Sequence, residues 1–208
     1  IIGFDIDIAQ AIADELGVEL EVKDMAFDGL IPALSTGKID MIIAGMNATE
    51  ERKQSVDFTD VYYTQTDIVV IRKEDADKFT SEDSLKTAAL ATQKATVQET
   101  YLLETFPDAE IQSVPKWNTA IMSLTTGKVD AVMMVDTVAK QFIAQNDDLM
   151  VANFDINSTP NAAAIAVAKN GGEFLETVNN IVNEMKESGK IEELYQLNDQ
   201  IVTDNTAE

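Results

Sequence analysis

Residues 33–40 read ALSTGKID, and residues 123–130 read SLTTGKVD. The two strings agree at five of eight positions, and the other three pairs are Ala/Ser, Ser/Thr and Ile/Val. Each string follows an amphipathic helical pattern and precedes an apolar run, MIIA in the first copy and AVMMV in the second. Gly suits the left-handed residue that ends a helix, and Lys suits the negative end of the helix dipole. The repeat predicts one helix–turn–strand unit in two copies and hence two similar α/β lobes, although a chance match at a common junction is the alternative.

Outward from the repeat, apolar periodicity predicts alternating helices and strands. In the first half we expect a helix over 7–16 closed by Gly17, a strand over 18–22, a helix from Asp28 to Gly37 and a strand over 39–44. In the second half we expect strands over 88–92, 109–114 and 129–135, helices over 97–106 and 118–126, and a long helix through 174–185. This alternation predicts an α/β fold with mostly parallel sheets.

Composition excludes several classes of function. The 208 residues hold 37 acidic and 15 basic side chains, a net charge of −22, which argues against nucleic-acid binding and against docking on an anionic membrane. The chain has no Cys and no His, so disulfides, thiolate nucleophiles, Ser-His-Asp triads and the usual zinc ligands are excluded. No run of 18 apolar residues is present. We expect no metal and no cofactor.

Candidate ligand contacts follow the two repeated strands, because ligands of open α/β sheets bind beyond the carboxyl ends of the strands. After the first strand come Ala44, Gly45 and Asn47, and then Thr49, which can cap a short helix carrying Arg52. Gly lets backbone approach a ligand closely, and a guanidinium fits a carboxylate with two parallel hydrogen bonds. The alternative for Arg52 is a surface ion pair with a nearby acidic side chain.

Asp136 directly follows the second strand, where a carboxylate can accept hydrogen bonds from an ammonium group. The alternative is an N-cap for a helix over 137–144, and both roles can hold at once. Arg52 in one lobe and Asp136 in the other would grip the two charged ends of one zwitterion. The pair therefore suggests capture of an α-amino acid.

Two further stretches are candidates. Phe27 precedes a helix and can pack on the aliphatic part of a ligand, or else serve as a core or staple residue. Gln93 and Thr96 lie where a strand runs into a helix, whose first N–H groups suit an anion; the alternative is an ordinary junction with Thr96 as N-cap.

The chain resembles the solute-binding proteins of polar amino-acid ABC transporters, bacterial extracellular family 3. The resemblance covers both lobes and nearly the whole chain. Its most specific string is TEERKQSVDFTDVYY (49–63). The other matching stretches are GFDIDIAQAIADELG (3–17), FDGLIPALSTGKIDMIIAGM (27–46), TGKVDAVMMVD (126–136) and MKESGKIEELY (185–195).

The resemblance implies a periplasmic-binding-protein type II fold, in which two Rossmann-like lobes are joined by two hinge strands. Lobe 1 would comprise 1–66 and 160–208, and lobe 2 would comprise 67–159. The first lobe would lack its N-terminal strand, because family members usually begin with a further strand. Arg52 would bind the α-carboxylate and Asp136 the α-ammonium. The remaining implied contacts are Ala44, Gly45, Asn47, Phe27, Thr96 and Gln93.

The implied function is non-catalytic capture of a free amino acid by hinge closure and its delivery to a membrane permease. The protein would be a monomer outside the cytoplasmic membrane, in a periplasm or as a lipoprotein on a Gram-positive surface. The alternatives are the sensing domain of a receptor and a dehydratase-type enzyme on the same fold. The family pattern is broken at Asn47, where Ser or Thr is usual, and at Ala95, where Gly is usual.

Overall fold

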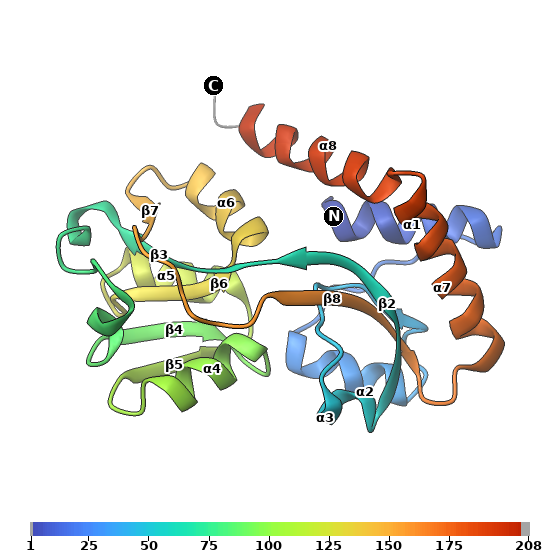
Figure 1. The fold of residues 1–208 in the computed structure, drawn as a ribbon, viewed down its shortest axis with the longest axis horizontal. Helices are drawn as coiled ribbons and strands as arrows, with labels where there is room; N and C mark the ends of the chain where they lie inside the picture. The colour runs from blue at the N-terminus through green and yellow to red at the C-terminus, as the bar shows by residue number, and fades with distance from the viewer. Residues whose placement is uncertain (1, 205–208) are drawn as a thin grey trace. The chain divides into compact units, whose positions relative to one another are not determined.

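The computed structural model describes residues 2–204, which divide into two compact units. Unit 1 comprises residues 1–25, 29–64 and 161–208, and unit 2 comprises 26–28 and 65–160. Within the described residues, no helix is both long enough and apolar enough to cross a membrane. Figure 1 gives the order of the helices and strands within each unit.

Unit 1 holds a three-stranded sheet in the order β1-β8-β2, in which β1 pairs antiparallel with β8. Its strands are β1 (Met41–Ile42), β2 (Val56–Gln65) and β8 (Asn161–Ala168). Its helices are α1 (Phe4–Leu16), α2 (Leu30–Ser35), α3 (Glu50–Lys53), α7 (Gly172–Glu187) and α8 (Lys190–Asp204). The short 3₁₀ turn η1 (Phe27–Gly29), whose residues 27 and 28 group with unit 2, precedes α2 in the chain.

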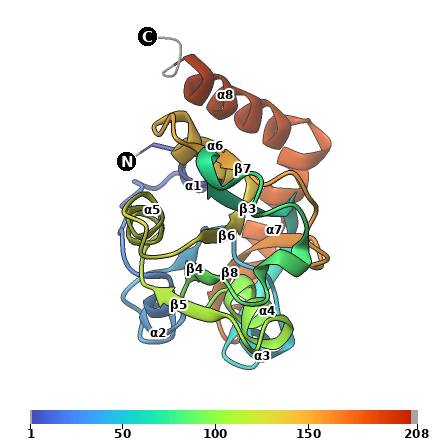
Figure 2. The same cartoon turned by 90° about the vertical axis from the view of Figure 1, so that its left-hand side faces the viewer.

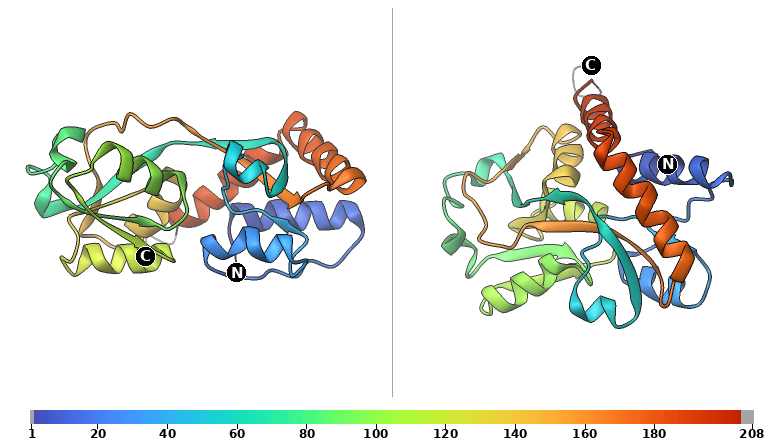
Figure 3. Two further views of the ribbon diagram at one scale, coloured as in Figure 1. Left: turned by 90° about the horizontal axis from the view of Figure 1, so that it is seen from below. Right: turned by 45° about the vertical axis from the view of Figure 1, so that its right-hand side comes forward.

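The core of unit 1 forms where α1, α7 and α8 pack together and against the sheet. In Figure 3 the blue helix α1 and the orange-red helices α7 and α8 lie side by side. The apolar stripe expected on the long helix is confirmed, since Val178, Val182 and Met185 are buried. From α1, Ile8 and Ile12 are fully buried, as the helical period of this segment predicts.

Two expected strands of unit 1 differ from the structure. The strand over 18–22 is wrong: the segment is irregular, and Val18 and Val22 are 58% and 38% exposed. A strand needs the backbone groups of a neighbour, and none of the described strands pairs with this segment. The strand over 39–44 shrinks to β1, because only Met41 and Ile42 pair with β8 before the chain turns at Gly45.

Unit 2 holds a five-stranded sheet in the order β5-β4-β6-β3-β7. Its strands are β3 (Asp67–Arg72), β4 (Ala89–Gln93), β5 (Glu110–Val114), β6 (Ala131–Val135) and β7 (Leu149–Val151). Its helices are α4 (Val97–Thr105), α5 (Trp117–Thr125) and α6 (Asp136–Ala144), with 3₁₀ turns η2 (Lys73–Asp75) and η3 (Glu82–Leu85).

The expectation of mostly parallel sheets is corrected to mixed sheets. In unit 2, β4 is parallel to β5 and β6, whereas β3 runs antiparallel to both β6 and β7. The parallel part comes from strand–helix–strand connections, as expected. The antiparallel part comes from β3, which enters directly from β2 rather than through a crossover helix.

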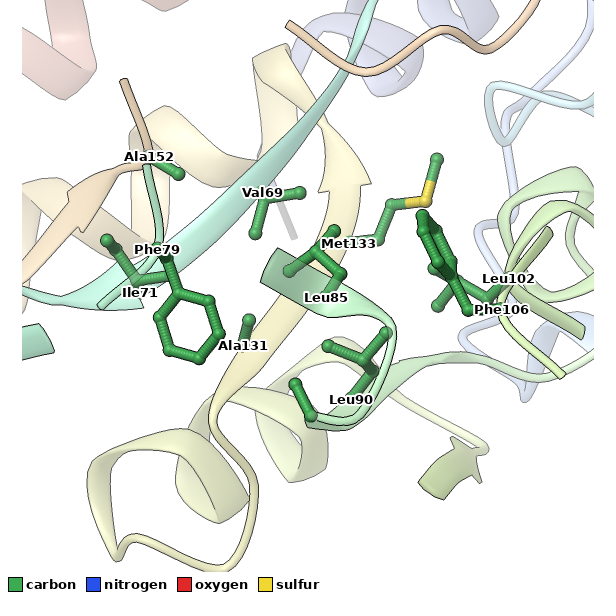
Figure 4. Close-up of a cluster of buried hydrophobic side chains, with 11 residues drawn as sticks. Val69, Ile71, Phe79, Leu85, Leu90, Leu102, Phe106, Ala131, Met133 and Ala152 are labelled. Atoms are coloured by element: carbon green, nitrogen blue, oxygen red, sulfur yellow. The ribbon is translucent and has the colours of Figure 1, made fainter. Parts of the chain in front are cut away.

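Both faces of the unit 2 sheet are covered by apolar side chains. On one face, Leu102 and Phe106 at the end of α4 pack with Phe79 and Leu85. Figure 4 shows these side chains beside Val69, Ile71 and Met133 of the sheet. On the other face, α5 and α6 pack on a second cluster, and Figure 2 shows α4 and α5 on opposite sides of the strands. Burial on both faces explains why AVMMV is a continuous apolar run.

The repeated string forms the same turn in both units. The amide of Lys38 donates to the carbonyl of Ala33 at 3.0 Å, and the amide of Lys128 donates to that of Ser123 at 2.9 Å. This bond closes a helix on a left-handed residue. The left-handed residues are Gly37 (φ 68°) and Gly127 (φ 71°). The local prediction from the repeat is confirmed.

At the C-terminal end of α5, the cation that contacts the backbone carbonyls is not Lys128 of the repeat, as the sequence suggested. Lys128 is exposed, and Arg72 of β3 instead donates from Nη1 to the carbonyls of Leu124 and Val129, both at 2.7 Å. The side chain of Arg72 is 15% exposed, and its Nη2 lies 2.6 Å from Asp75. Arg72 thus adds a charged donor to the Leu124 carbonyl, which also accepts from the Gly127 amide at 3.1 Å, and binds the Val129 carbonyl after the turn.

Replacing Arg72 with Ala should lower the free energy of unfolding by about 2–4 kcal/mol, because it removes the charged donor of the Val129 and Leu124 carbonyls and the cation that pairs with the Asp75 carboxylate. Lys86→Ala is the matched control, because Lys86 pairs with Asp83 at an exposed site and its loss should leave stability nearly unchanged. Urea unfolding followed by circular dichroism measures both. Equal stability of the two variants would contradict this role.

Asp57 of β2 gives the stability of unit 1 a pH dependence. It accepts hydrogen bonds from Lys169 Nζ at 2.6 Å and from the Asn170 and Gly171 amides at 2.7 and 3.3 Å, just before α7. The hydrogen bond from Lys169 lowers the pKa of Asp57 below its ordinary value. The charged carboxylate therefore stabilises the fold above the unfolded-state pKa of about 3.9, and this contribution is lost as the pH falls through the lower folded-state pKa.

Asp57→Asn should accordingly destabilise the protein at pH 7, and the gap to wild type should shrink steadily below about pH 4. Thermal unfolding from pH 7 to pH 2.5 measures the gap. The exposed Asp147→Asn serves as control and should leave no such pH-dependent gap. A gap for Asp57→Asn that stays constant down to pH 2.5 would refute the assignment.

Candidate functional site

Met46 and Asn47, which follow β1, pair with β8 through their backbone groups. The carbonyl of Met46 accepts from the amide of Ala164 at 2.9 Å, and Asn47 forms a β-bridge with Ala163. Between Ala44 and Met46 the chain passes through Gly45 at φ 58°, in the left-handed region. The backbone at this position therefore favours glycine, which adopts such a φ without strain. Ala44, Gly45 and Asn47 are fixed by the sheet.

Arg52 folds back onto the same segment. Thr49 caps α3 as expected, since its hydroxyl accepts from the Arg52 amide at 3.3 Å. The guanidinium Nη1 then donates to the Asn47 carbonyl at 2.9 Å. Partial burial lowers the pKa of Arg52 below its ordinary value, but guanidinium groups stay protonated in proteins. The structure thus brings four predicted contacts together in unit 1: Ala44, Gly45, Asn47 and Arg52.

Two residues that sequence reasoning missed support Gly45. The Gly45 amide donates to the Tyr62 hydroxyl at 3.2 Å, and that hydroxyl donates to Asp5 Oδ1 at 2.8 Å. Burial raises the pKa of Tyr62 well above its ordinary value, so the phenol stays protonated and keeps donating. Burial also raises the pKa of Asp5. Both residues lie within the quoted GFDID and VYY strings, but nothing in their spacing indicates that they meet.

In unit 2, the loop from Gln93 to Thr96 is closed by its own side chains. The Thr96 hydroxyl donates to the Gln93 carbonyl at 2.6 Å and accepts from the Glu99 amide at 3.2 Å, which confirms Thr96 as the N-cap of α4. Between them Ala95 has φ 63°, and its amide donates to the Glu99 carboxylate at 2.6 Å. The carboxylate at this helix start is therefore one of the chain's own. The side-chain Nε2 of Gln93 donates to the Pro115 carbonyl at 3.1 Å.

Asp136 is the first residue of α6 rather than the residue before it, so the expected helix start is off by one. Its Oδ1 accepts from the Thr137 amide at 2.9 Å, and its own amide donates to the Thr66 carbonyl at 2.9 Å. Because β4 and β6 are parallel neighbours, their carboxyl ends share one edge of the sheet. Gln93, Thr96 and Asp136 are therefore brought to the same edge of unit 2.

Phe27 is half-buried in η1, on a stretch that groups with unit 2. Among the described residues, no group of three or more Asp or Glu side chains is placed to hold a metal ion. The candidate contacts thus offer a guanidinium and backbone groups in unit 1, and a carboxylate, a side-chain amide and a hydroxyl in unit 2. Such groups recognise a small polar molecule by hydrogen bonds and charge.

Known proteins resemble this chain along most of its length. The arginine-binding extracellular protein ArtP of Bacillus subtilis is 32% identical over 197 residues, which cover 93% of this chain and 76% of that protein. A probable histidine-binding protein of Campylobacter jejuni is 35% identical over 188 residues, covering 90% and 72%.

Solved structures confirm the type II periplasmic-binding-protein fold. The amino acid ABC transporter substrate-binding protein AbpA of Streptococcus pneumoniae, bound to L-arginine, superposes with a TM-score of 0.92 at 34% identity, covering 97% of this chain and 85% of that one. A family model for bacterial extracellular solute-binding proteins, family 3, matches residues 1–197. The chain belongs to this family of extracellular solute-binding proteins.

Proposed function

We propose that this protein binds a free polar L-amino acid without chemical change and delivers it to the permease of an ABC transporter. Arg52 of unit 1 pairs with the α-carboxylate, and Asp136 of unit 2 pairs with the α-ammonium. Ligand binding is then complete only when the two units close on the same molecule, which shifts an open–closed equilibrium toward the closed form. The permease then recognises the closed form of the protein.

The observation that carries the proposal is the guanidinium of Arg52, held on the backbone of the 44–52 segment by the Asn47 carbonyl. A partly buried, oriented guanidinium is suited to bidentate binding of a carboxylate. Gly45, Asn47 and Ala44 supply backbone groups beside it. In unit 2, Gln93 and Thr96 lie at the edge that carries Asp136, and Phe27 provides an apolar surface.

Basic amino acids are the first ligands to test. The relatives named above are described as arginine- and histidine-binding, and AbpA was solved with L-arginine. The net charge of −22 favours the approach of a ligand with net positive charge and disfavours glutamate and aspartate. We place the protein outside the cytoplasmic membrane as a monomer, in a periplasm or as a surface lipoprotein.

Arg52→Ala should weaken binding of L-arginine at least about a hundredfold in isothermal titration calorimetry, because the ligand carboxylate loses its charged partner. Lys53→Ala is the control: it removes the adjacent cation, which pairs with Glu50 at an exposed site, and should leave affinity within about threefold. Near-normal affinity of the Arg52 variant would refute the proposed carboxylate site.

Asp136→Asn should lower affinity for L-arginine by about tenfold to a hundredfold, because the side chain keeps an oxygen for the Thr137 amide but loses the charge that pairs with the ammonium. The exposed Asp148→Asn, in the same unit, controls for the general loss of one negative charge. If both variants bind L-arginine equally well, Asp136 does not hold the ammonium.

A further inference from the structure

Gln65, the last residue of β2, is the feature of unit 2 that the proposed contacts leave unexplained. Its side chain is buried, with the residue only 8% exposed. Its Nε2 donates to the Thr137 hydroxyl at 2.6 Å. Its Oε1 is buried and has no hydrogen-bond partner among the residues that the structure describes. A buried acceptor without a donor lowers the stability of the fold. A donor outside the chain, such as a bound ligand, could pair with this oxygen.

The free oxygen belongs to an amide that lies against the start of α6. Thr137, whose hydroxyl accepts the hydrogen bond from Gln65 Nε2, directly follows Asp136. The carbonyl of Thr66, the residue after Gln65, accepts a hydrogen bond from the backbone amide of Asp136 at 2.9 Å. Gln65 and Asp136 are thus placed beside one another by two separate bonds, from side chain and from backbone.

The rest of this corner is well satisfied, so loose packing does not explain the free oxygen. Asp67 is 8% exposed, and its two oxygens accept from Gln98 Nε2 at 2.7 Å and from the Ser158 hydroxyl at 2.8 Å. Gln98 is as deeply buried as Gln65, at 4% exposed. Within the 65–67 segment as described, Gln65 Oε1 is the buried side-chain oxygen that lacks a hydrogen-bond partner.

We propose that Gln65 Oε1 accepts a hydrogen bond from the α-ammonium of the bound amino acid, alongside the carboxylate of Asp136. This inference rests on the proposed function. An ammonium group carries three donors, and one carboxylate does not exhaust them. A neutral amide oxygen takes a further donor without adding a second negative charge beside Asp136. Gln65 is then a specificity-determining residue that raises the affinity for ligands with a free amino group.

The test compares L-arginine with 5-guanidinopentanoate, the same molecule without its α-ammonium, on wild type, Gln65→Leu and Thr137→Val. Gln65→Leu should weaken L-arginine binding about tenfold to a hundredfold and leave the affinity for the analogue, measured by competition, nearly unchanged. Thr137→Val breaks the same internal bond but keeps Oε1, and should cost clearly less. Ligand-free Gln65→Leu should melt close to wild type, because it removes a buried unsatisfied acceptor along with the bond to Thr137, and these two effects oppose one another.

A second variant keeps the test decisive if the analogue binds too weakly to measure. Gln65→Glu keeps an oxygen acceptor at this position but adds the second negative charge that the amide avoids, so it should restore part of the L-arginine affinity that Gln65→Leu loses. Equal losses for both ligands, equal losses for Gln65→Leu and Thr137→Val, or no rescue by Gln65→Glu would overturn the inference. A wild-type protein that binds no amino acid would instead overturn the proposed function.

Discussion

The register between β3 and β6 determines where the candidate contacts of unit 2 lie. Asp67 pairs with Val135, so the point where the chain enters unit 2 lies directly beside the residue before Asp136. The Thr66 carbonyl and the Asp136 amide close this corner. Because β3 is antiparallel to β6, the end of β6 must meet the start of β3. The start of α6, which carries the proposed ammonium contact Asp136, and the entry of the chain therefore form one structural corner, so a substitution at either position should alter the other.

The features that sequence predicted well are those set by neighbours in the chain. The helical stripe of α7, the glycine turns of the repeat and the hydroxyl caps at Thr49 and Thr96 need only residues a few positions apart. Short stretches of sequence are enough to show their physical causes. These causes are the apolar periodicity, the glycine at a left-handed position and the unpaired backbone amides at a helix start.

The features that sequence could not predict depend on distant partners. The 18–22 segment has the alternation of a strand, but no described strand pairs with it. The Gly45–Tyr62–Asp5 chain joins residues up to 57 positions apart, and Arg72 reaches carbonyls 52 and 57 positions away. Gln65 carries no motif at all, and its free oxygen is visible only once the burial of its neighbours is known. Eight candidate contacts could be named from spacing and resemblance, but not the groups that hold them in place.

Ala95 has a consequence for the energetics of recognition. A residue with a β-carbon at φ 63° holds an unfavourable backbone conformation, and it is kept there by the bond from its amide to Glu99 and by the Thr96–Gln93 bond on either side. The loop therefore gives up its freedom when the polypeptide folds. In the proposed mode of binding, a solute at this end of unit 2 would find these four residues already ordered, and its affinity would not be reduced by the entropy of ordering them.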